Sequence, residues 1–184
     1  MNVQPILDAI RARQTDGRVF VLAIDGRAGS GKTTLAAALS DALGAPVIAM
    51  DDFFLPPELR TAERRAEPGG NVHYERFAAE VLPHLASPAP FSYRALDCAT
   101  FGYTERAVSE GMIRIVEGSY SRHPFFGEYA DFTLFCDVAP DEQRRRIERR
   151  NGDRAQAFFD LWIPLEERYF AAFEIEQNAD MIVK

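Results

Sequence analysis

Residues 26–33 read Gly-Arg-Ala-Gly-Ser-Gly-Lys-Thr (GRAGSGKT), and they decide the fold that we expect for this chain. They fit the Walker A pattern Gly-x-x-x-x-Gly-Lys-[Ser/Thr], in which a glycine-rich loop surrounds phosphate groups with backbone N–H groups. A continuous apolar run over 19–24 precedes them, and a helical pattern over 33–43 follows. Because this strand, loop and helix order is the one in which the pattern binds phosphate, the sequence predicts a nucleotide-binding loop.

The residue types of this loop suggest separate roles. Gly26, Gly29 and Gly31 allow unusual backbone angles and a close approach to an anion. Lys32 is expected to reach the β- and γ-phosphates of ATP, and the Thr33 hydroxyl is expected to bind Mg²⁺. The full set of predicted ATP-binding residues is Gly26, Ala28, Gly29, Ser30, Gly31, Lys32, Thr33, Thr34 and Arg145.

Strand and helix patterns alternate along the rest of the chain. Further strands are predicted at 47–50, 112–116, 132–138 and 181–183, and helices at 3–13, 74–85, 141–150 and 155–173, the last kinked or split at Pro164. This alternation predicts an α/β P-loop NTPase fold with a mainly parallel, five-stranded sheet flanked by helices. We expect one domain over 1–184, with a substrate-side excursion at roughly 53–105 that includes an irregular hairpin at 91–103, and a small Arg-rich lid at roughly 144–156.

Carboxylate side chains follow two of the other predicted strands. Asp51 and Asp52 come after the strand at 47–50, and Glu117 follows the strand at 112–116. Ligands of such sheets collect beyond the carboxyl ends of the strands, so these groups should meet the loop at one site. Either aspartate is a candidate base for an attacking hydroxyl, although such a pair also caps turns. Glu117 is a candidate ligand of Mg²⁺, directly or through water.

Residues 143–154 (QRRRIERRNGDR) are rich in arginine. They fit a solvated helix face with acidic partners at Glu142 and Glu148. They fit better a lid that folds over the triphosphate, neutralises its charge and excludes water. The strongest candidates in this lid are Arg145, Arg149 and Arg154.

Composition excludes several classes of function. The net charge of −7 argues against a nucleic-acid partner. No apolar run reaches the roughly 18 residues of a membrane span, and the first residues lack the apolar core of a signal peptide. Cys98 and Cys136 have no metal-ligand spacing, so we predict two buried free thiols. A cytoplasmic protein with a small-molecule acceptor is expected, and a homo-oligomer stays open.

The chain has only two lysines, Lys32 and Lys184. Guanine-specific GTPases read the base with an Asn/Thr-Lys-x-Asp segment, and no such segment exists here, which argues against a GTPase. The aromatic residues at 158–173, including Trp162, fit core packing better than base stacking.

Taken together, the motifs resemble the uridine kinase and phosphoribulokinase group of P-loop small-molecule kinases. The segments that carry the resemblance, in order, are IDGRAGSGKTT (24–34), MDDFF (50–54), IVEGSY (115–120), the stretch 137–154 and ADMIV (179–183). The resemblance implies that Asp51 is the general base, that Thr33 and Glu117 hold Mg²⁺, and that Arg145 and Arg149 belong to the lid. The catalytic residues that we predict are Asp51, Lys32 and Arg149.

The acceptor side matches this group less well. Uridine kinases recognise the nucleoside with a Tyr-Asp-Phe segment followed by a His, and here Leu96-Asp97-Cys98 and Phe101 stand at those places, so only Asp97 carries over. Arg150 stands where the lid of the group has an aspartate. The acceptor residues that we predict are Asp52, His73, Tyr93 and Asp97.

The sequence therefore predicts an ATP- and Mg²⁺-dependent kinase for a hydroxyl of a small metabolite. Its acceptor is a nucleoside or another alcohol, such as a pentose phosphate or a pantothenate-like compound. The rival function is a regulatory ATPase or switch, in which hydrolysis drives association with a protein partner.

Overall fold

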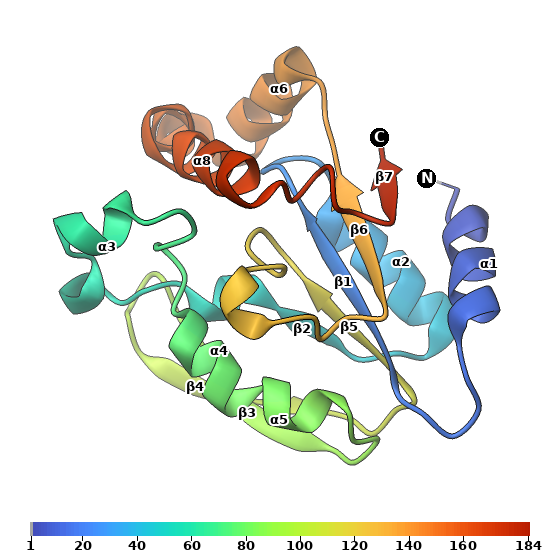
Figure 1. Ribbon diagram of the computed structural model, residues 1–184. Coiled ribbons are helices and arrows are strands. Elements are labelled where there is room, and N and C mark those ends of the chain that lie inside the picture. Colours follow the sequence, from blue (N-terminus) through green and yellow to red (C-terminus); the bar gives the residue numbers. More distant parts are fainter. Residues whose placement is uncertain (1) are drawn as a thin grey trace.

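The computed structural model describes residues 2–184. Its central sheet has five parallel strands in the order β2-β5-β1-β6-β7 (Figure 1). The strands are β1 (Phe20–Gly26), β2 (Val47–Ala49), β5 (Ile113–Glu117), β6 (Phe132–Cys136) and β7 (Met181–Val183). The predicted α/β class and the predicted five-stranded parallel sheet are confirmed.

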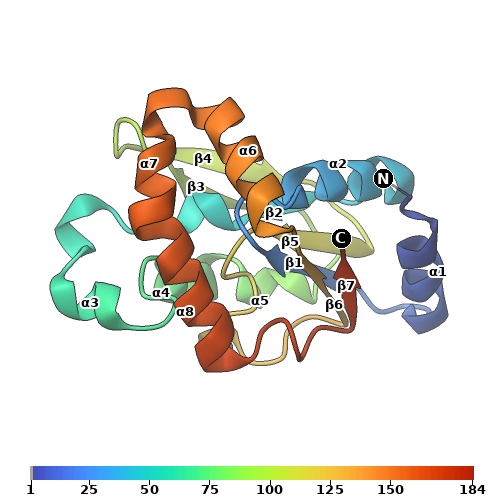
Figure 2. The same cartoon turned by 90° about the horizontal axis from the view of Figure 1, so that it is seen from above.

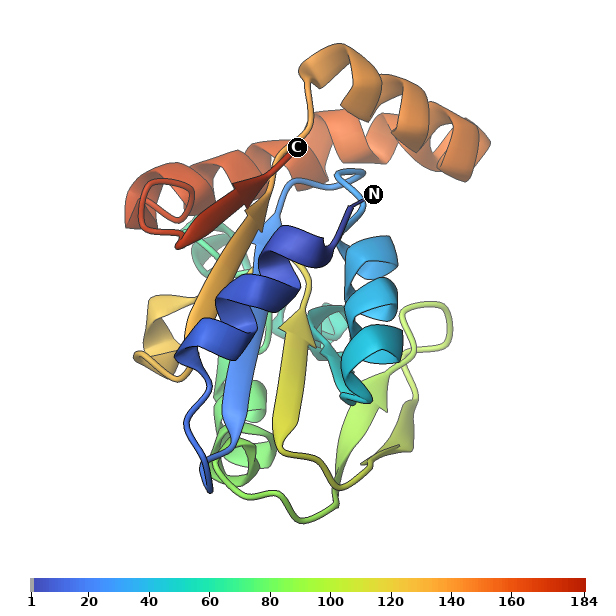
Figure 3. The same ribbon diagram turned by 90° about the vertical axis from the view of Figure 1, so that its right-hand side faces the viewer.

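Both faces of the sheet are covered, which explains why β1 is apolar throughout. Leu22 and Ile24 pack with Leu35 of helix α2 (Lys32–Leu43) and with helix α1 (Gln4–Arg13) on one face (Figure 3). Val21 belongs to a second core on the other face, which includes Phe77. Alternate side chains of β1 thus point into different cores, so every position in the strand is buried.

The excursion between β2 and β5 contains short helices and a hairpin. Helices α3 (Ala62–Ala66), α4 (Tyr74–Glu80) and α5 (Leu82–Leu85) precede strands β3 (Phe91–Leu96) and β4 (Tyr103–Val108). The predicted helix at 74–85 is interrupted at Val81, since Pro83 cannot donate a backbone hydrogen bond. The hairpin is regular and antiparallel, with Phe91 opposite Val108, so the predicted irregular hairpin at 91–103 was too short.

Three helices cross the end of the sheet where the strands terminate (Figures 1 and 2). They are α6 (Pro140–Asn151), α7 (Ala155–Ala157) and α8 (Ile163–Phe173). Gly152 has a φ of 52° where α6 ends, and a π-helical turn at 158–162 precedes Pro164. The predicted break after the Arg-rich helix is confirmed, and the predicted helix at 155–173 is divided before Pro164 by the π-helical turn.

Neither cysteine forms a disulfide. Cys136 is buried in β6, and burial raises the pKa of its thiol to about 12. Cys98 is exposed in the turn of the β3–β4 hairpin, so the prediction that both thiols are buried is wrong for this residue. Among residues 2–184, no helix combines the length and the apolar character that crossing a bilayer would require.

Candidate functional site

The Gly-rich loop (residues 26–33) joins the end of β1 to the start of α2. Gly29 and Gly31 have φ values of 73° and 99°, which favour glycine. A Cβ atom on Gly26 would lie 2.2 Å from the Cys136 carbonyl oxygen, so only glycine fits there. No side chain caps the N-terminus of α2, which leaves the first N–H groups of the helix available to an anion.

A cavity of about 820 Å³ opens over this loop. The predicted site residues that line it are Ala28, Gly29, Gly31, Lys32, Thr33, Thr34, Asp51, Glu117 and Arg149. They come from the Gly-rich loop, from the ends of β2 and β5, and from α6. The structure therefore brings together the three strand ends that the sequence placed at one edge. Gly26 and Ser30 are buried and are not among the lining residues.

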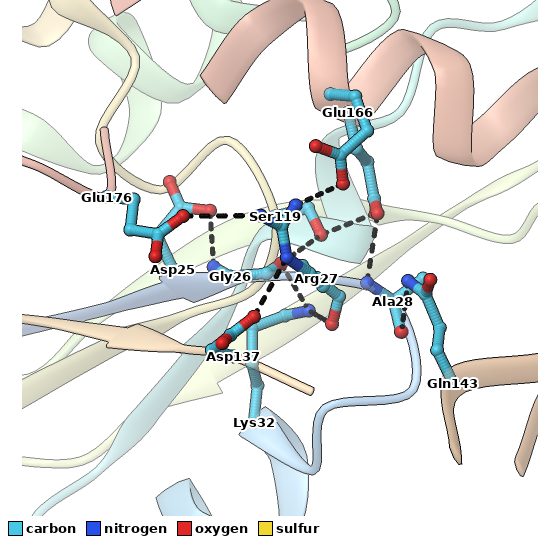
Figure 4. Close-up of polar contacts among 11 residues, drawn as sticks. Asp25, Gly26, Arg27, Ala28, Lys32, Ser119, Asp137, Gln143, Glu166 and Glu176 are labelled. Carbon is cyan, nitrogen blue, oxygen red and sulfur yellow. Dashed lines mark hydrogen bonds and ion pairs between the residues drawn. The ribbon is translucent and has the colours of Figure 1, made fainter. Parts of the chain in front are cut away.

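Lys32 is held close to the loop that precedes it. Its Nζ atom donates to the carbonyl oxygens of Gly26 at 2.8 Å and Arg27 at 2.9 Å (Figure 4). The Ser119 hydroxyl oxygen lies 3.0 Å from the same Gly26 oxygen. The ammonium group thus sits at the mouth of the loop, where the phosphates of a nucleotide would lie.

Thr33 and Glu117 form a pair of oxygen ligands beside the loop. The Thr33 hydroxyl lies 3.4 Å from a carboxylate oxygen of Glu117. Burial, and then the charge of Asp51, raise the pKa of Glu117. A nearby cation would relieve this cost, and hydroxyl and carboxylate oxygens are the ligands that Mg²⁺ prefers. The two side chains fit a magnesium site.

Asp51 and Asp52 are adjacent in sequence but face different surroundings. Asp51 lines the cavity and is accessible to solvent, yet the surrounding protein still raises the pKa of its carboxyl group. Asp52 is buried outside the lining, where it accepts a hydrogen bond from the Tyr93 hydroxyl at 2.7 Å and pairs with Arg106 at 3.3 Å. Of the two aspartates, Asp51 is therefore the candidate base.

The arginines of α6 that reach the cavity differ in part from those predicted. Arg146 donates to the carbonyl oxygens of Gly29 at 3.1 Å and Ser30 at 3.4 Å, and Arg149 and Arg150 also line the cavity. Two predicted lid residues do not. Arg145 is exposed and pairs with Glu142 at 2.7 Å, and Arg154 is exposed outside the lining.

The phase of α6 explains this correction. Ile147 is its only aliphatic residue after Pro140, and it is buried against the loop side, beside Ala155. Arg150, at +3 from Ile147, shares its face and Arg146, at −1, borders that face, whereas Arg145 lies on the opposite side. Arg149, at +2, also lines the cavity, although the helical period does not place it on the face of Ile147. The position of Ile147 was therefore a sequence signal for Arg146 and Arg150, but not for Arg149.

Glu166 of α8 is a site residue that the sequence reasoning missed. Its buried carboxylate accepts from the Ala28 N–H at 2.9 Å and from the Ser119 hydroxyl at 2.7 Å (Figure 4). Burial raises the pKa of this group, and it lines the cavity. No pattern marks Glu166 in the sequence, because both partners lie far away in the chain.

Asp25 was also missed, although its position gives a signal. It is a charged residue inside the apolar run that leads to the loop, and it is completely buried. Its carboxylate accepts from the N–H groups of Gly26 at 2.7 Å and Tyr120 at 3.2 Å, and from the Tyr169 hydroxyl at 2.8 Å. Burial nevertheless raises its pKa. Asp25 joins the Gly-rich loop, the segment after β5 and α8.

Arg27 fixes the loop from its outer side (Figure 4). Its guanidinium pairs with Asp137 at 2.9 Å, with Glu176 at 3.2 Å and also with Glu167. These partners come from the end of β6, from α8 and from the segment that follows it. The loop is thus held in place by ion pairs that leave its cavity side open.

The other predicted acceptor residues do not line the cavity. Tyr93 is buried and donates to Asp52, and His73 packs outside the lining. Asp97 is exposed in the hairpin turn, where it accepts from the N–H of Ala99 at 2.8 Å and the hydroxyl of Thr100 at 2.9 Å. Residues that do line the cavity, but were not predicted as site residues, include Phe54, Leu55, Arg60, Arg65, Asn71, Cys98, Tyr120, Phe158 and Trp162.

Part of the aromatic group at 158–173 is therefore exposed to the site. Phe158 and Trp162 line the cavity, which corrects their prediction as core residues. Phe170 belongs to the core, and Phe173 packs against it. The π-helical turn at 158–162 rotates the chain between α7 and α8, so the helical period cannot be carried across it.

The comparisons with known proteins rest on structure. No family model and no curated protein matches the sequence. A protein from Bacillus stearothermophilus described as a possible uridine kinase has a TM-score of 0.77 and 24% identity, covering 99% of this chain and 97% of its own. A protein from Silicibacter sp. TM1040, described provisionally as a fructose transport system kinase, has a TM-score of 0.76 and 24% identity over 100% of both chains.

A more distant likeness is to D-glycerate 3-kinase from Cryptococcus neoformans var. grubii, with a TM-score of 0.55 and 14% identity, covering 90% of this chain and 84% of that one. All three proteins are described as kinases that act on small molecules. The arrangement of the sheet, the Gly-rich loop and the crossing helices is shared over nearly the whole length of the first two. The chain therefore has the P-loop kinase fold of these structures.

Proposed function

We propose that this chain is an ATP- and Mg²⁺-dependent phosphotransferase that moves the γ-phosphate to a hydroxyl of a small metabolite, as a uridine kinase does. The observation that carries the proposal is the position of Asp51. This accessible carboxylate shares one cavity with Lys32 and with the Thr33–Glu117 pair. An ATPase that only switches between states needs no base placed for an alcohol, whereas a kinase does.

The donor half of the proposed reaction uses the Gly-rich loop. Its N–H groups and the N-terminus of α2 bind the phosphates of ATP, and Lys32 neutralises charge on the β- and γ-phosphates. Bound Mg²⁺ supplies further neutralisation of the phosphates, and Thr33 and Glu117 are the residues that would hold it. Arg146, Arg149 and Arg150 approach from α6 and add positive charge over the same region.

The acceptor half uses Asp51. Its carboxylate takes the proton of the acceptor hydroxyl, and the resulting nucleophilic oxygen forms a bond to the γ-phosphorus while the bond to the β–γ bridging oxygen breaks. ADP leaves, and the phosphorylated acceptor is the product. The raised pKa of Asp51 makes this carboxylate a better proton acceptor than an ordinary aspartate.

The test is ADP release from Mg²⁺-ATP with a panel of nucleosides, sugars and hydroxy acids. At least one acceptor should raise the rate tenfold or more above the rate without acceptor. The variant Lys32→Ala, purified in the same way, should lose the activity and so exclude a contaminating kinase. Steady hydrolysis that no small acceptor changes, but that a protein partner stimulates, would instead identify the switch.

A further inference from the structure

Two arginines of the excursion between β2 and β5 line the cavity and have no acidic partner within residues 2–184. Arg60 and Arg65 line the cavity, and neither forms an ion pair with any group in residues 2–184. Their neighbour Arg64 is different, since it is bound to Glu75 at 2.7 Å and to the Gly70 carbonyl at 3.0 Å. The excursion thus uses one arginine for its own structure and presents two others to the cavity.

Arg60 is fixed in a way that keeps its outer nitrogens free. Its Nε atom donates to the Leu55 carbonyl at 2.7 Å, and its guanidinium lies 5.4 Å from the centre of the Phe101 ring. Neither terminal nitrogen has a hydrogen-bond partner among the described residues. A guanidinium held by one edge is preorganised to bind a carboxylate or phosphate with the other.

Arg60 shares the cavity with the candidate base Asp51. Cys98 of the hairpin turn lines this same cavity. The arginines of α6 come from another part of the chain, with Arg146 bound to the carbonyl oxygens of the Gly-rich loop. A nucleotide held by that loop accounts for the α6 arginines but leaves Arg60 and Arg65 without a role.

The charge of the cavity is opposite to that of the chain. Six basic residues line it, namely Lys32, Arg60, Arg65, Arg146, Arg149 and Arg150, against three acidic residues, Asp51, Glu117 and Glu166. The difference is three positive charges, whereas the whole chain has a net charge of −7. A cavity of this kind concentrates anions in an otherwise acidic protein.

Polar groups suited to the uncharged part of an acceptor lie in the same lining. Asn71 and Tyr120 both line the cavity, and Asn71 Oδ1 is buried with no hydrogen-bond partner within residues 2–184. Buried polar atoms without partners are costly, so they are natural contacts for hydroxyl groups of a ligand. Phe54 and Trp162 supply apolar walls.

We propose that the acceptor is a small polyhydroxylated compound with an anionic group, a phosphate or a carboxylate, which Arg60 and Arg65 bind while a hydroxyl of the acceptor reaches Asp51. This inference rests on the proposed function and narrows it. Neutral nucleosides and free sugars lack the group that the two arginines recognise, so they are poor acceptors.

The experiment compares matched neutral and anionic compounds. ADP release is measured with glycerol against glycerol 3-phosphate and D-glycerate, and with ribose against ribose 5-phosphate. The expected result is a kcat/KM at least 100-fold higher for an anionic member, and the comparison of phosphate with carboxylate identifies the anion. If a neutral member is as good as its anionic partner, the inference fails while the kinase function stands.

Variants separate recognition from folding. Arg65→Gln removes a side chain with no hydrogen bond or ion pair in the described structure, so it should leave the melting temperature unchanged and reduce kcat/KM for the anionic acceptor at least tenfold through KM. Arg60→Gln should act in the same direction. The control Arg11→Gln makes the same charge change on exposed α1 and should have no effect. Unchanged KM in both cavity variants would overturn the inference.

A binding measurement covers the case in which no compound is turned over. Trp162 is the only tryptophan and lines the cavity, so its fluorescence reports ligands there. In protein saturated with Mg²⁺ and a non-hydrolysable ATP analogue, the anionic compounds should bind saturably and Arg65→Gln should weaken them. Binding without turnover would refute the kinase and keep the anion site, whereas no binding at millimolar concentrations would refute the anion site.

Discussion

The substitutions Asp51→Asn and Asp52→Asn should have opposite consequences, although they change neighbouring residues by the same few atoms. Asp51 faces the cavity, and its carboxylate is disfavoured by the protein around it, as its raised pKa shows. A carboxyl group whose folded-state pKa lies above its unfolded value reduces stability at neutral pH, because the charged form is less favourable in the folded state. Asp51→Asn removes that charge, so the protein should be equally stable or more stable.

The effect of Asp51→Asn should appear as a lower turnover rate. A positioned general base contributes about 10²- to 10⁴-fold to the rate, which corresponds to about 3 to 5 kcal/mol of transition-state stabilisation. Asp51→Asn should reduce kcat by that factor while ATP still binds, since the Gly-rich loop is untouched. The variant would thus be less active and no less stable.

Asp52→Asn should show the reverse. Asp52 accepts from the buried Tyr93 hydroxyl and pairs with Arg106, whose side chain is 53% exposed. The hydrogen bond contributes about 1 kcal/mol and the half-exposed ion pair less than about 1 kcal/mol. A loss of about 1 to 2 kcal/mol would lower the melting temperature by about 2 to 8 °C for a chain of this size. Activity should fall by much less than in Asp51→Asn.

Three measurements on both variants check this reasoning: coupled ADP release at saturating acceptor, thermal unfolding, and the affinity for a non-hydrolysable ATP analogue. Turnover of Asp51→Asn within threefold of the wild type would refute the role of Asp51 as the base. A large loss of turnover in Asp52→Asn, with a normal melting temperature, would transfer that role to Asp52.

Two further predictions concern the metal site and pH. Glu117→Gln should raise the Mg²⁺ concentration needed for half-maximal activity by about 10- to 100-fold, because it weakens one of two oxygen ligands, and an unchanged Mg²⁺ titration would contradict the site. His123 is buried and its pKa is lowered to about 4, so the unfolded chain binds a proton first as the pH falls below about 6.5. Protonation of this residue in the unfolded chain should therefore lower the free energy of unfolding by about 3 kcal/mol as the pH falls from 6.5 to 4. Urea titration at several pH values measures this change. In His123→Asn that part of the pH dependence should disappear, and an unaltered slope would show that other groups cause it.

The parts of the fold that the sequence predicts well are those whose interactions are local. The run at 19–24, the glycines that follow it and the helix after them specify β1, the Gly-rich loop and α2 without information from elsewhere in the chain. The meeting of Asp51 and Glu117 with that loop followed from the geometry of parallel strands. Both predictions need only the spacing of apolar residues along the chain and the rule that parallel strands end at the same edge of a sheet.

The residues that were missed depend on contacts between distant segments. Glu166 lies 138 residues from Ala28, and nothing in its own helix distinguishes it from an exposed glutamate. Asp97 was assigned by position in a motif, but its carboxylate closes its own turn with Ala99 and Thr100. Arg60 and Arg65 are unremarkable in a polar excursion, and only the absence of acidic partners in the described structure distinguishes them from Arg64.

The contacts of the Gly-rich loop with α6 and α8 have a thermodynamic consequence. Arg146 holds the carbonyl groups of Gly29 and Ser30, and Glu166 holds the N–H of Ala28, so both helices that cross the sheet end are bonded to the loop. Any compound that changes the equilibrium position of α6 or α8 must then change the free energy of phosphate binding at the loop. By reciprocity, phosphate changes the affinity for that compound by the same factor. One coupling free energy would therefore describe both effects, and four hydrogen bonds from α6 and α8 to the loop backbone would carry it, including the one that Gln143 donates to the Ala28 carbonyl at 3.0 Å.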